Sequence, residues 1–232
     1  MEKDIIRLFQ KGFNYSQDGP GNRLVYHLQG CNLYCPWCAN PEGIPPSPPE
    51  GLKSSATEMT VDEMLYEILS CRPLFVDGGG VTFTGGEPTL WWKPLGRLLC
   101  KVKAENINTA IETNGTHPDL PLWVPYIDTW MMDLKHHDPA VHKQLTGKGN
   151  ETTIENIRKI TGMKVTVHIR IPLIANINAS LKDLQGFARL LSSFDRNFIT
   201  VELLPYHEYG RAKWQKCGME YTITNGFVPK ET

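Results

Sequence analysis

Three cysteines lie close together in the segment GCNLYCPWC, at Cys31, Cys35 and Cys38. Thiolates are soft ligands that favour zinc, copper(I) or iron–sulfur clusters. A structural zinc site is closed by four protein ligands, and the nearest candidate for a fourth, His27, lies in the middle of a predicted strand. A cubane of four irons can instead take three thiolates and leave one iron open. The C-x₃-C-x₂-C spacing therefore favours a [4Fe–4S] cluster with an open iron, and zinc is the alternative.

The other three cysteines stand singly in the chain. Cys71 and Cys100 fall at apolar positions of predicted helices, where we expect small buried thiols. Cys217 has no partner in sequence and receives no role. Cysteines that are clustered in a reducing compartment usually bind metal or do chemistry.

Composition places the chain among globular proteins of the cytoplasm. Its 232 residues are 41% hydrophobic with a formal net charge of −1, which fits a single domain over residues 1–232. A charge balance this near neutrality predicts no nucleic-acid partner. Residues 1–13 mix charged with apolar side chains, unlike a secretory signal, and no apolar run reaches the roughly 18–20 residues of a membrane helix. We therefore expect a cytoplasmic monomer with no membrane partner.

Short apolar segments rich in β-forming residues alternate with helical patterns along the chain. The predicted strands are residues 23–30, 80–85, 107–113, 128–134, 164–171 and 198–205. The predicted helices are residues 60–71, 93–105, 152–162 and 180–194. This alternation implies an α/β fold in which a parallel sheet carries helices on its outer face. Six units suit a partial (β/α)₆ barrel of the TIM type better than a complete barrel of eight. The Pro-rich segment 40–58 is expected to be an exposed loop.

Polar residues gather where these strands are predicted to end. The first strand runs into the cysteine loop at residues 31–38, and the fifth carries His168 and Arg170. The ends of the other strands read TGGEP (84–88), ETNG (112–115), MMDLK (131–135) and PYHE (205–208). In a parallel α/β barrel, functional residues gather at the carboxyl ends of the strands. The sequence therefore predicts one site built from all six strand ends.

The cysteine motif resembles the signature of the radical S-adenosylmethionine enzymes, with the aromatic Trp37 just before the third cysteine. In that superfamily the open iron binds the amino and carboxylate groups of S-adenosylmethionine. The segment TGGEP is similar to the superfamily's glycine-rich motif, whose backbone accepts the methionyl ammonium. The resemblance implies reductive cleavage of S-adenosylmethionine to methionine and a 5′-deoxyadenosyl radical.

A narrower resemblance covers nearly the whole chain. The segments DGPGNRLVYHLQGCNLYC, GGGVTFTGGEP, ETNG, MMDLK, HIR and LLPYHEYGRAKW are similar, in this order, to those of the glycyl-radical enzyme activases, the family of pyruvate formate-lyase activating enzyme. It implies an oxidoreductase whose radical abstracts hydrogen from a backbone glycine of a partner glycyl-radical enzyme. It also implies flavodoxin or ferredoxin as electron donor. Residues 39–70 contain no cysteine, so the chain resembles members without a ferredoxin-like insert.

Two other functions stay open. A radical S-adenosylmethionine enzyme acting on a small molecule, such as a 7-carboxy-7-deazaguanine synthase-like lyase, would share the cysteine and TGGEP motifs but not LLPYHEYGRAKW. A zinc- or cluster-binding interaction protein would leave the polar strand ends unexplained.

The resemblance to the activases also implies roles for individual residues. Cys31, Cys35 and Cys38 would ligate the cluster. The cofactor contacts would come from Trp37, Gly85, Gly86, Glu87, Glu112, Thr113, Met131, Asp133, Lys135, Arg170 and His207. The candidate catalytic residues are Lys135, His207 and Asp18, the last of which would meet the incoming glycine loop. Alternatively, Lys135 is a solvated surface charge and Arg170 pairs with a carboxylate at the end of the sheet.

The chain departs from the family pattern at Glu112. Pyruvate formate-lyase members carry an aspartate there, and it helps to hold a monovalent cation beside the methionyl carboxylate. A glutamate could still reach Na⁺ or K⁺, or it could meet the ammonium directly. Relatives also usually continue into one more helix beyond residues 227–232.

Overall fold

The computed structural model describes residues 4–50, 56–224 and 226. The chain divides into two compact units. Unit 1 comprises Met1–Asn32, Glu42–Thr113 and Leu122–Met131, and unit 2 comprises Leu33–Pro41, Asn114–Pro121 and Met132–Thr232. The single domain expected over residues 1–232 stays a prediction. Over the residues described, no helix is long and apolar enough to cross a membrane.

Unit 1 is built on a sheet of five strands in the spatial order β3-β1-β2-β4-β5. These strands are β1 (Ile5–Tyr15), β2 (Asn22–Leu28), β3 (Thr57–Thr60), β4 (Gly80–Gly85) and β5 (Asn108–Thr113). β2, β4 and β5 run parallel, as predicted, but β1 runs antiparallel to both β2 and β3. The expectation of a purely parallel sheet is therefore wrong at this edge, because β1 and β3 were not predicted as strands.

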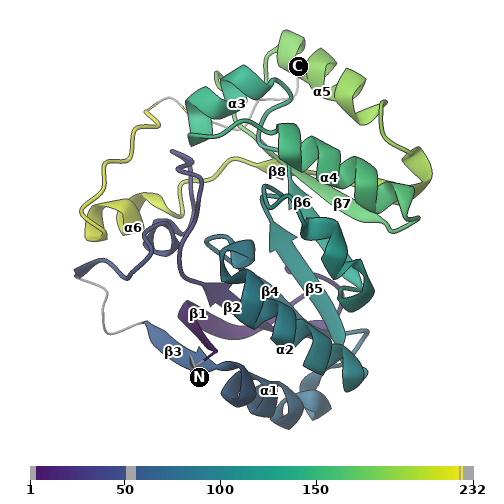
Figure 1. Cartoon of the computed structure of the whole chain (residues 1–232). Coiled ribbons are helices and arrows are strands. Elements are labelled where there is room, and N and C mark those ends of the chain that lie inside the picture. The colour runs from purple at the N-terminus through teal and green to yellow at the C-terminus, as the bar shows by residue number, and fades with distance from the viewer. Residues whose placement is uncertain (1–3, 51–55, 225, 227–232) are drawn as a thin grey trace. The chain divides into compact units, whose positions relative to one another are not determined.

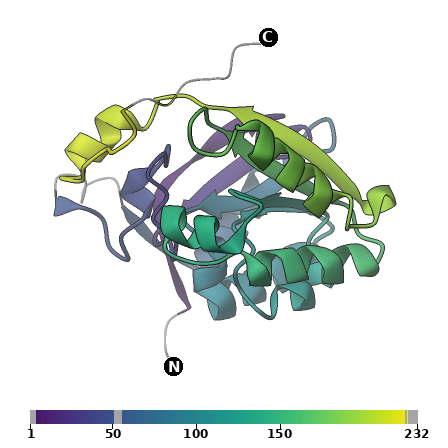
Figure 2. The same ribbon diagram turned by 90° about the horizontal axis from the view of Figure 1, so that it is seen from above.

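Helices α1 (Val61–Ser70) and α2 (Trp92–Ala104) cover one face of this sheet, as Figures 1 and 2 show. α1 begins with the expected capping box, in which Thr60 and Glu63 satisfy each other's backbone N–H groups. Tyr26 of β2 reaches this layer and donates a hydrogen bond of 2.7 Å to Glu67. The buried side chains between helices and sheet include Met64, Ile68, Phe83, Leu95, Leu98, Leu99, Val102 and Ile111.

The opposite face of the unit 1 sheet is polar. Strand residues alternate between faces, and the register pairs Val25 with Thr82 and His27 with Thr84. Arg23 is fully buried on this face, and its guanidinium donates to the Thr82 hydroxyl and to several main-chain carbonyls. Burial lowers the pKa of Arg23 to about 10, so it remains charged at neutral pH. Two of the unit 1 residues predicted to do chemistry, Asp18 and Glu112, lie on this polar side.

Unit 2 contains the parallel pair β7 (Val167–Leu173) and β8 (Ile199–Pro205). Its helices are α3 (Pro139–Thr146), α4 (Glu151–Gly162), α5 (Leu181–Leu191) and α6 (Arg211–Lys216). β6 (Thr129–Asp133) crosses the boundary between the units. α4 and α5 confirm two predicted helices, whereas the short α3 and α6 were missed. The shorter 3₁₀ turns are η1 (Pro41–Gly43), η3 (Arg72–Leu74), η4 (Pro88–Trp91), η5 (Leu120–Tyr126) and η6 (Arg196–Phe198).

The segment 40–58 is not simply an exposed loop, and that prediction is wrong at both of its ends. Gly43 and Ile44 are buried, and their carbonyls accept hydrogen bonds of 2.9 Å from the N–H groups of Gly30 and Cys31. At the other end, residues 57 and 58 belong to β3. Residues 51–55 lie outside the described part of the chain. The start of this segment therefore fixes the backbone at the first cysteine.

The isolated cysteines are less buried than expected. Cys100 is exposed, because the buried positions of α2 are Leu95, Leu98, Leu99 and Val102 on the other side of the helix. Cys71 is half-buried at the C-terminal cap of α1. The expectation of two buried thiols is thus wrong for Cys100.

Candidate active site

The turn after β4 is packed too tightly for a side chain at Gly86. A Cβ atom there would lie 2.0 Å from the Gly30 carbonyl oxygen and 2.5 Å from that of Gly43. Gly85 has a φ of +120°, which only glycine adopts readily. Gly86 N–H donates to Leu28 O at 2.8 Å, and Glu87 N–H donates to Gly30 O at 2.7 Å. The glycine turn is therefore bonded through its backbone to the residue that precedes Cys31.

Glu87 is fully buried, and its carboxylate organises the turn. Its Oε1 atom accepts hydrogen bonds from Thr89 N–H (3.1 Å), Thr89 Oγ1 (2.6 Å) and Thr113 Oγ1 (2.6 Å). These bonds join the end of β4 to the end of β5. The structure thus brings together Glu87 and Thr113, two residues that the sequence assigned to one site.

Glu112 and Asp18 lie along the polar face of the unit 1 sheet. The Thr84 hydroxyl donates to Glu112 Oε2 at 2.6 Å. The Thr82 hydroxyl donates to the Asp18 carbonyl at 2.7 Å, and Asn14 donates to the Asp18 carboxylate. Because Thr82 and Thr84 alternate with Phe83 in β4, both hydroxyls point to the same face. The DGPG turn therefore packs on the face that carries Glu112, one step nearer the start of β4.

Unit 2 holds Lys135 beside acidic groups. Its ammonium lies 2.9 Å from Asp133 Oδ2, and the two side chains are only 15% and 21% exposed. Burial alone would lower the pKa of Lys135, but Asp133 and the Cys35 and Cys38 thiolates raise it above its usual value. Lys135 is therefore a largely buried cation paired with Asp133. The alternative that it is a solvated surface charge is wrong.

The second and third cysteines share a tight turn in unit 2. Cys38 N–H donates to Cys35 O at 3.1 Å, and Tyr34 N–H donates to Thr146 O at the end of α3 at 2.8 Å. Cys35 and Trp37 are buried, and Cys38 is half-buried. The first cysteine belongs to unit 1, as does Met131, which is buried in β6.

Arg170 and His207 differ in their surroundings. Arg170 is buried and lies 3.0 Å from Glu202 Oε2, so the carboxylate pairing that was left open is present. β7 continues to Leu173, which leaves His168 and Arg170 short of its carboxyl end and corrects their expected position. His207 is exposed, and its ring stacks on Tyr209 with centroids 4.3 Å apart.

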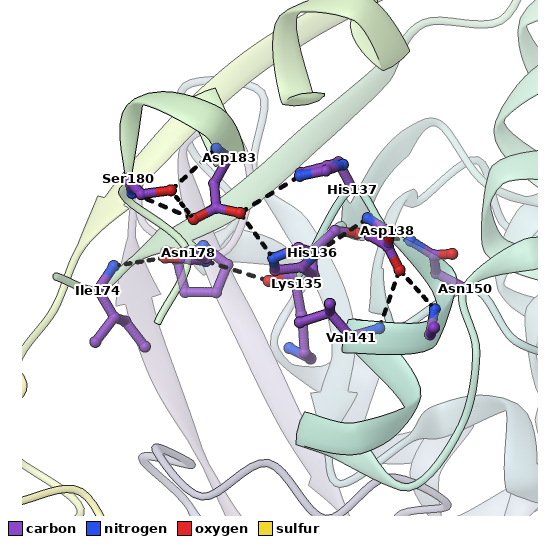
Figure 3. Close-up of polar contacts among 12 residues, drawn as sticks. Lys135, His136, His137, Asp138, Val141, Asn150, Ile174, Asn178, Ser180 and Asp183 are labelled. Carbon is purple, nitrogen blue, oxygen red and sulfur yellow. Dashed lines mark hydrogen bonds and ion pairs between the residues drawn. The ribbon is translucent and has the colours of Figure 1, made fainter. Parts of the chain in front are cut away.

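The sequence did not predict the residues that hold the backbone after Lys135 (Figure 3). Asn178 is fully buried and donates to Lys135 O at 3.2 Å and to Pro172 O at 2.6 Å. The imidazoles of His136 and His137 both face Asp183 Oδ1, at 3.3 and 3.5 Å. The run KHHD directly after MMDL was the available signal, but its partner in α5 is distant in sequence.

The His136–His137–Asp183 group brings two imidazoles against one carboxylate. Within the described chain these three residues place possible metal ligands within 4.8 Å of one another. However, His136 Nδ1 accepts a hydrogen bond from Asp138 N–H at 3.0 Å. A neutral imidazole then carries its proton on Nε2, which faces Asp183. Because metal at Nε2 would have to displace that proton, the arrangement favours a hydrogen bond to the carboxylate.

Comparison with known proteins identifies the family. The Radical SAM superfamily profile matches residues 25–190. The chain is 37% identical over 223 residues to the pyruvate formate-lyase-activating enzyme of Staphylococcus epidermidis, covering 92% of this chain and 86% of that protein. The chain belongs to this family of radical SAM activating enzymes. The enzyme of the same name from Staphylococcus aureus is 35% identical, again over 92% of this chain and 86% of that protein.

Solved structures of radical SAM proteins confirm the fold of this family member. A domain of the pyruvate formate-lyase-activating enzyme from Bacteroides vulgatus aligns with a TM-score of 0.51 at 29% identity, covering 61% of this chain and 96% of that one. QueE from Escherichia coli aligns with a TM-score of 0.58 at 17% identity, covering 92% of this chain and 89% of QueE. A radical SAM methyltransferase from Sphaerobacter thermophilus aligns with a TM-score of 0.60 at 16% identity, covering 93% of this chain and 71% of the methyltransferase. The predicted α/β partial barrel of the radical SAM type is confirmed.

Radical SAM activating enzymes use a [4Fe–4S] cluster and S-adenosylmethionine, and this chain is an enzyme of that kind. The residues present fit the cluster. Cys35 and Cys38 lie close enough to the Lys135 ammonium that their negative charge, once they are deprotonated, raises the pKa of Lys135. Thiolate is the protonation state that iron–sulfur ligation requires, and the nearby cation favours it.

Replacing Gly86 with alanine should disrupt the glycine turn, because the added Cβ would overlap two main-chain oxygens. Gly12→Ala is the matched control, since a Cβ at Gly12 meets nothing within 4 Å. We expect Gly86→Ala to lower the free energy of unfolding by about 1–3 kcal/mol and to abolish measurable S-adenosylmethionine binding. Urea denaturation and isothermal titration would measure these effects. Equal binding by Gly86→Ala and Gly12→Ala would contradict the tight turn.

Proposed function

We propose that the chain activates a glycyl-radical enzyme of the pyruvate formate-lyase type by installing a radical on a backbone glycine. The observation that carries this proposal is the 35–37% identity to enzymes named for that activation over 92% of the chain. The likeness to QueE and to a radical SAM methyltransferase, at 16–17% identity, supports the fold alone. The small-molecule alternative therefore has no observation in its favour.

In this proposal Cys31, Cys35 and Cys38 hold the cluster. When bound, the cluster and S-adenosylmethionine supply the one-electron cleavage that yields methionine and the 5′-deoxyadenosyl radical. The protein binds and orients these groups and excludes water. The Cys31 N–H bond to Ile44 O, and the turn between Cys35 and Cys38, preorganise the ligands before iron binds. Lys135 offsets the negative charge of the thiolates.

The methionine moiety would lie against the backbone of Gly85 and Gly86. Glu87 then acts through the turn, because its buried Oε1 is occupied by Thr89 and Thr113. Glu112 would meet either the methionyl ammonium or a monovalent cation, while Thr84 fixes its orientation. The remaining contacts to cosubstrate would come from Trp37, Met131, Asp133, Arg170 and His207.

Asp18 would meet the glycine-bearing loop of the partner. Its carboxylate belongs to the DGPG turn, whose backbone is anchored to Thr82 on the same face as Glu112. Carboxylate oxygens accept hydrogen bonds from the N–H groups of an extended peptide. Electrons would come from a flavodoxin or ferredoxin, and we expect the activase to act as a cytoplasmic monomer.

Changing any one of Cys31, Cys35 and Cys38 to alanine should abolish the cluster, because a cubane with one open iron needs all three thiolates. Anaerobically reconstituted wild-type protein should hold about one [4Fe–4S] cluster, whose EPR signal changes on addition of S-adenosylmethionine. Cys100→Ala, at an exposed thiol, is the control and should retain the cluster. Zinc in place of iron, or cluster loss in Cys100→Ala, would overturn the assignment.

Glu112→Gln should weaken S-adenosylmethionine binding by about 1–3 kcal/mol, the cost of leaving a charged partner unpaired. Glutamine can still accept the Thr84 hydrogen bond, so the change removes charge and keeps the local structure. Repeating the titration in Na⁺, K⁺ and a bulky organic cation tests for a cation site, since only the wild type should respond. Glu105→Gln, at the exposed end of α2, is the control. Wild-type affinity in Glu112→Gln would show that this carboxylate faces neither group.

Asp18→Asn should separate cosubstrate cleavage from radical transfer. We expect nearly unchanged reductive cleavage of S-adenosylmethionine, because Asp18 contacts the partner loop. Glycyl-radical formation, measured as an EPR doublet on pyruvate formate-lyase, should fall by roughly tenfold, which corresponds to about 1.4 kcal/mol. Asp62→Asn, on the exposed side of α1, is the control. If both reactions slow equally, Asp18 does not serve the protein substrate.

A further inference from the structure

The segment LLPYHEYGRAKW (203–214) contacts the cysteine loop directly. Figures 1 and 2 show α6 beside the segment that follows β2 and carries the cysteines. Trp214 is fully buried in α6, and its indole Nε1–H donates to the Cys38 carbonyl at 2.9 Å. The Lys213 ammonium donates to Asn40 Oδ1 at 2.8 Å. Both bonds lie within unit 2.

Gly210 allows this close approach. A Cβ atom at Gly210 would lie 2.3 Å from the Cys38 carbonyl oxygen and 2.9 Å from Ala39 Cα. Any side chain at this position would push the turn away from the loop. Gly210 is the residue before α6, and its carbonyl accepts hydrogen bonds from Lys213 and Trp214 N–H. The same glycine therefore starts the helix and leaves room for the cysteine loop.

The Trp214 ring also contacts the loop on the other side of the cysteine pair. Tyr34, the residue before Cys35, packs edge-on against the indole with ring centroids 5.5 Å apart. Trp214 thus touches both the residue that precedes Cys35 and the carbonyl of Cys38. A backbone carbonyl that loses its donor in a protein interior is costly, so we expect loss of the indole N–H to loosen the loop at its third cysteine.

We propose that Gly210 and Trp214 are positioning residues for the iron–sulfur cluster, holding Cys35 and Cys38 in the conformation that ligates iron. This inference rests on the proposed ligation by these cysteines. It assigns to the LLPYHEYGRAKW segment retention of the cofactor rather than contact with the substrate. Groups that orient metal ligands through hydrogen bonds typically change metal affinity by about 10–100-fold when they are removed.

Trp214→Phe tests the indole N–H, because phenylalanine keeps an aromatic ring against Tyr34 and removes the donor to Cys38 O. The matched control is Trp123→Phe, at a buried tryptophan of unit 1 that stacks on Trp92. Reconstituted holoenzyme would be challenged anaerobically with an iron chelator, and the cluster followed by its visible absorbance and EPR signal. We expect loss about tenfold faster in Trp214→Phe and a wild-type rate in Trp123→Phe.

Two further measurements separate positioning from general stability. Urea denaturation of each apo-protein reports the free energy of unfolding, and the alkylation rates of Cys35 and Cys38 in the folded apo-protein report the mobility of the loop. Trp214→Phe should raise the alkylation rate severalfold without denaturant, whereas Trp123→Phe should not. Should Trp214→Phe fail to fold, Lys213→Met is the milder variant that removes the bond to Asn40, with the exposed Lys216→Met as its control.

The outcomes also separate this inference from the proposed function. If wild-type protein binds no [4Fe–4S] cluster, the ligation itself is wrong. If the wild type holds the cluster but Trp214→Phe and Lys213→Met lose it no faster than their controls, the ligation stands and the positioning role is wrong. Faster cluster loss with unchanged alkylation of Cys35 and Cys38 would also overturn it, because the loop would then be equally ordered without the indole.

Discussion

Position 86 has no room for a side chain, and the glycine turn of unit 1 depends on that constraint. Because Gly86 lacks a Cβ, the end of β4 can approach the carbonyls of Gly30 and Gly43. The hydrogen bonds from Gly86 to Leu28 and from Glu87 to Gly30 then become possible. They place the glycine turn beside the residue that leads into Cys31. A larger residue would separate the two segments before any cofactor could bind.

The same close approach explains why Glu87 is buried. The N–H of Glu87 donates to the Gly30 carbonyl. Its carboxylate then accepts hydrogen bonds from the N–H and hydroxyl of Thr89 and from the hydroxyl of Thr113. A buried carboxylate needs such partners, since it would otherwise pay a large desolvation penalty. Glu87 therefore joins the turn to the end of β5 through Thr113. Glu112 directly precedes Thr113, so the same bond helps to fix the backbone that carries Glu112.

Unit 2 uses a similar device around Cys35 and Cys38. Gly210 provides room for the Cys38 carbonyl, as Gly86 does for that of Gly30. In unit 1 the donors next to the glycine come from the main chain, whereas in unit 2 the donor is the indole of Trp214. In unit 1 the Gly30 carbonyl accepts a hydrogen bond beside Gly86, and in unit 2 the Cys38 carbonyl accepts one beside Gly210. A Cβ atom on either Gly86 or Gly210 would overlap that carbonyl.

Much of this architecture can be predicted from local pattern. The central strands β4 and β5 are short apolar runs between turn signals, which is typical of buried parallel strands. β1 was missed because Arg7 and Lys11 interrupt its apolar residues, although both side chains lie on the surface and pair with Glu58 and Glu67. β1 lies between β3 and β2, and these ion pairs accommodate its charged residues within the sheet.

The site was predicted less completely, because spacing reveals residue types but not partners. The motif TGGEP indicates a glycine turn, yet nothing in it shows that the Glu87 side chain is buried against Thr113. Likewise, Arg170 was expected near a strand end, and only the extra length of β7 shows that it lies further back. The contact between His136 and Asp183 joins residues far apart in sequence, and no local period encodes it.

The protein itself stabilises the charge on Lys135, through the neighbouring carboxylate of Asp133. Asp133, two residues earlier, is largely buried, and without the ammonium at 2.9 Å its carboxylate would be left without its cation. The negative charge of Cys35 and Cys38, once they are deprotonated, also raises the pKa of Lys135. The fold therefore holds a cation beside Cys35 and Cys38, next to its own largely buried carboxylate.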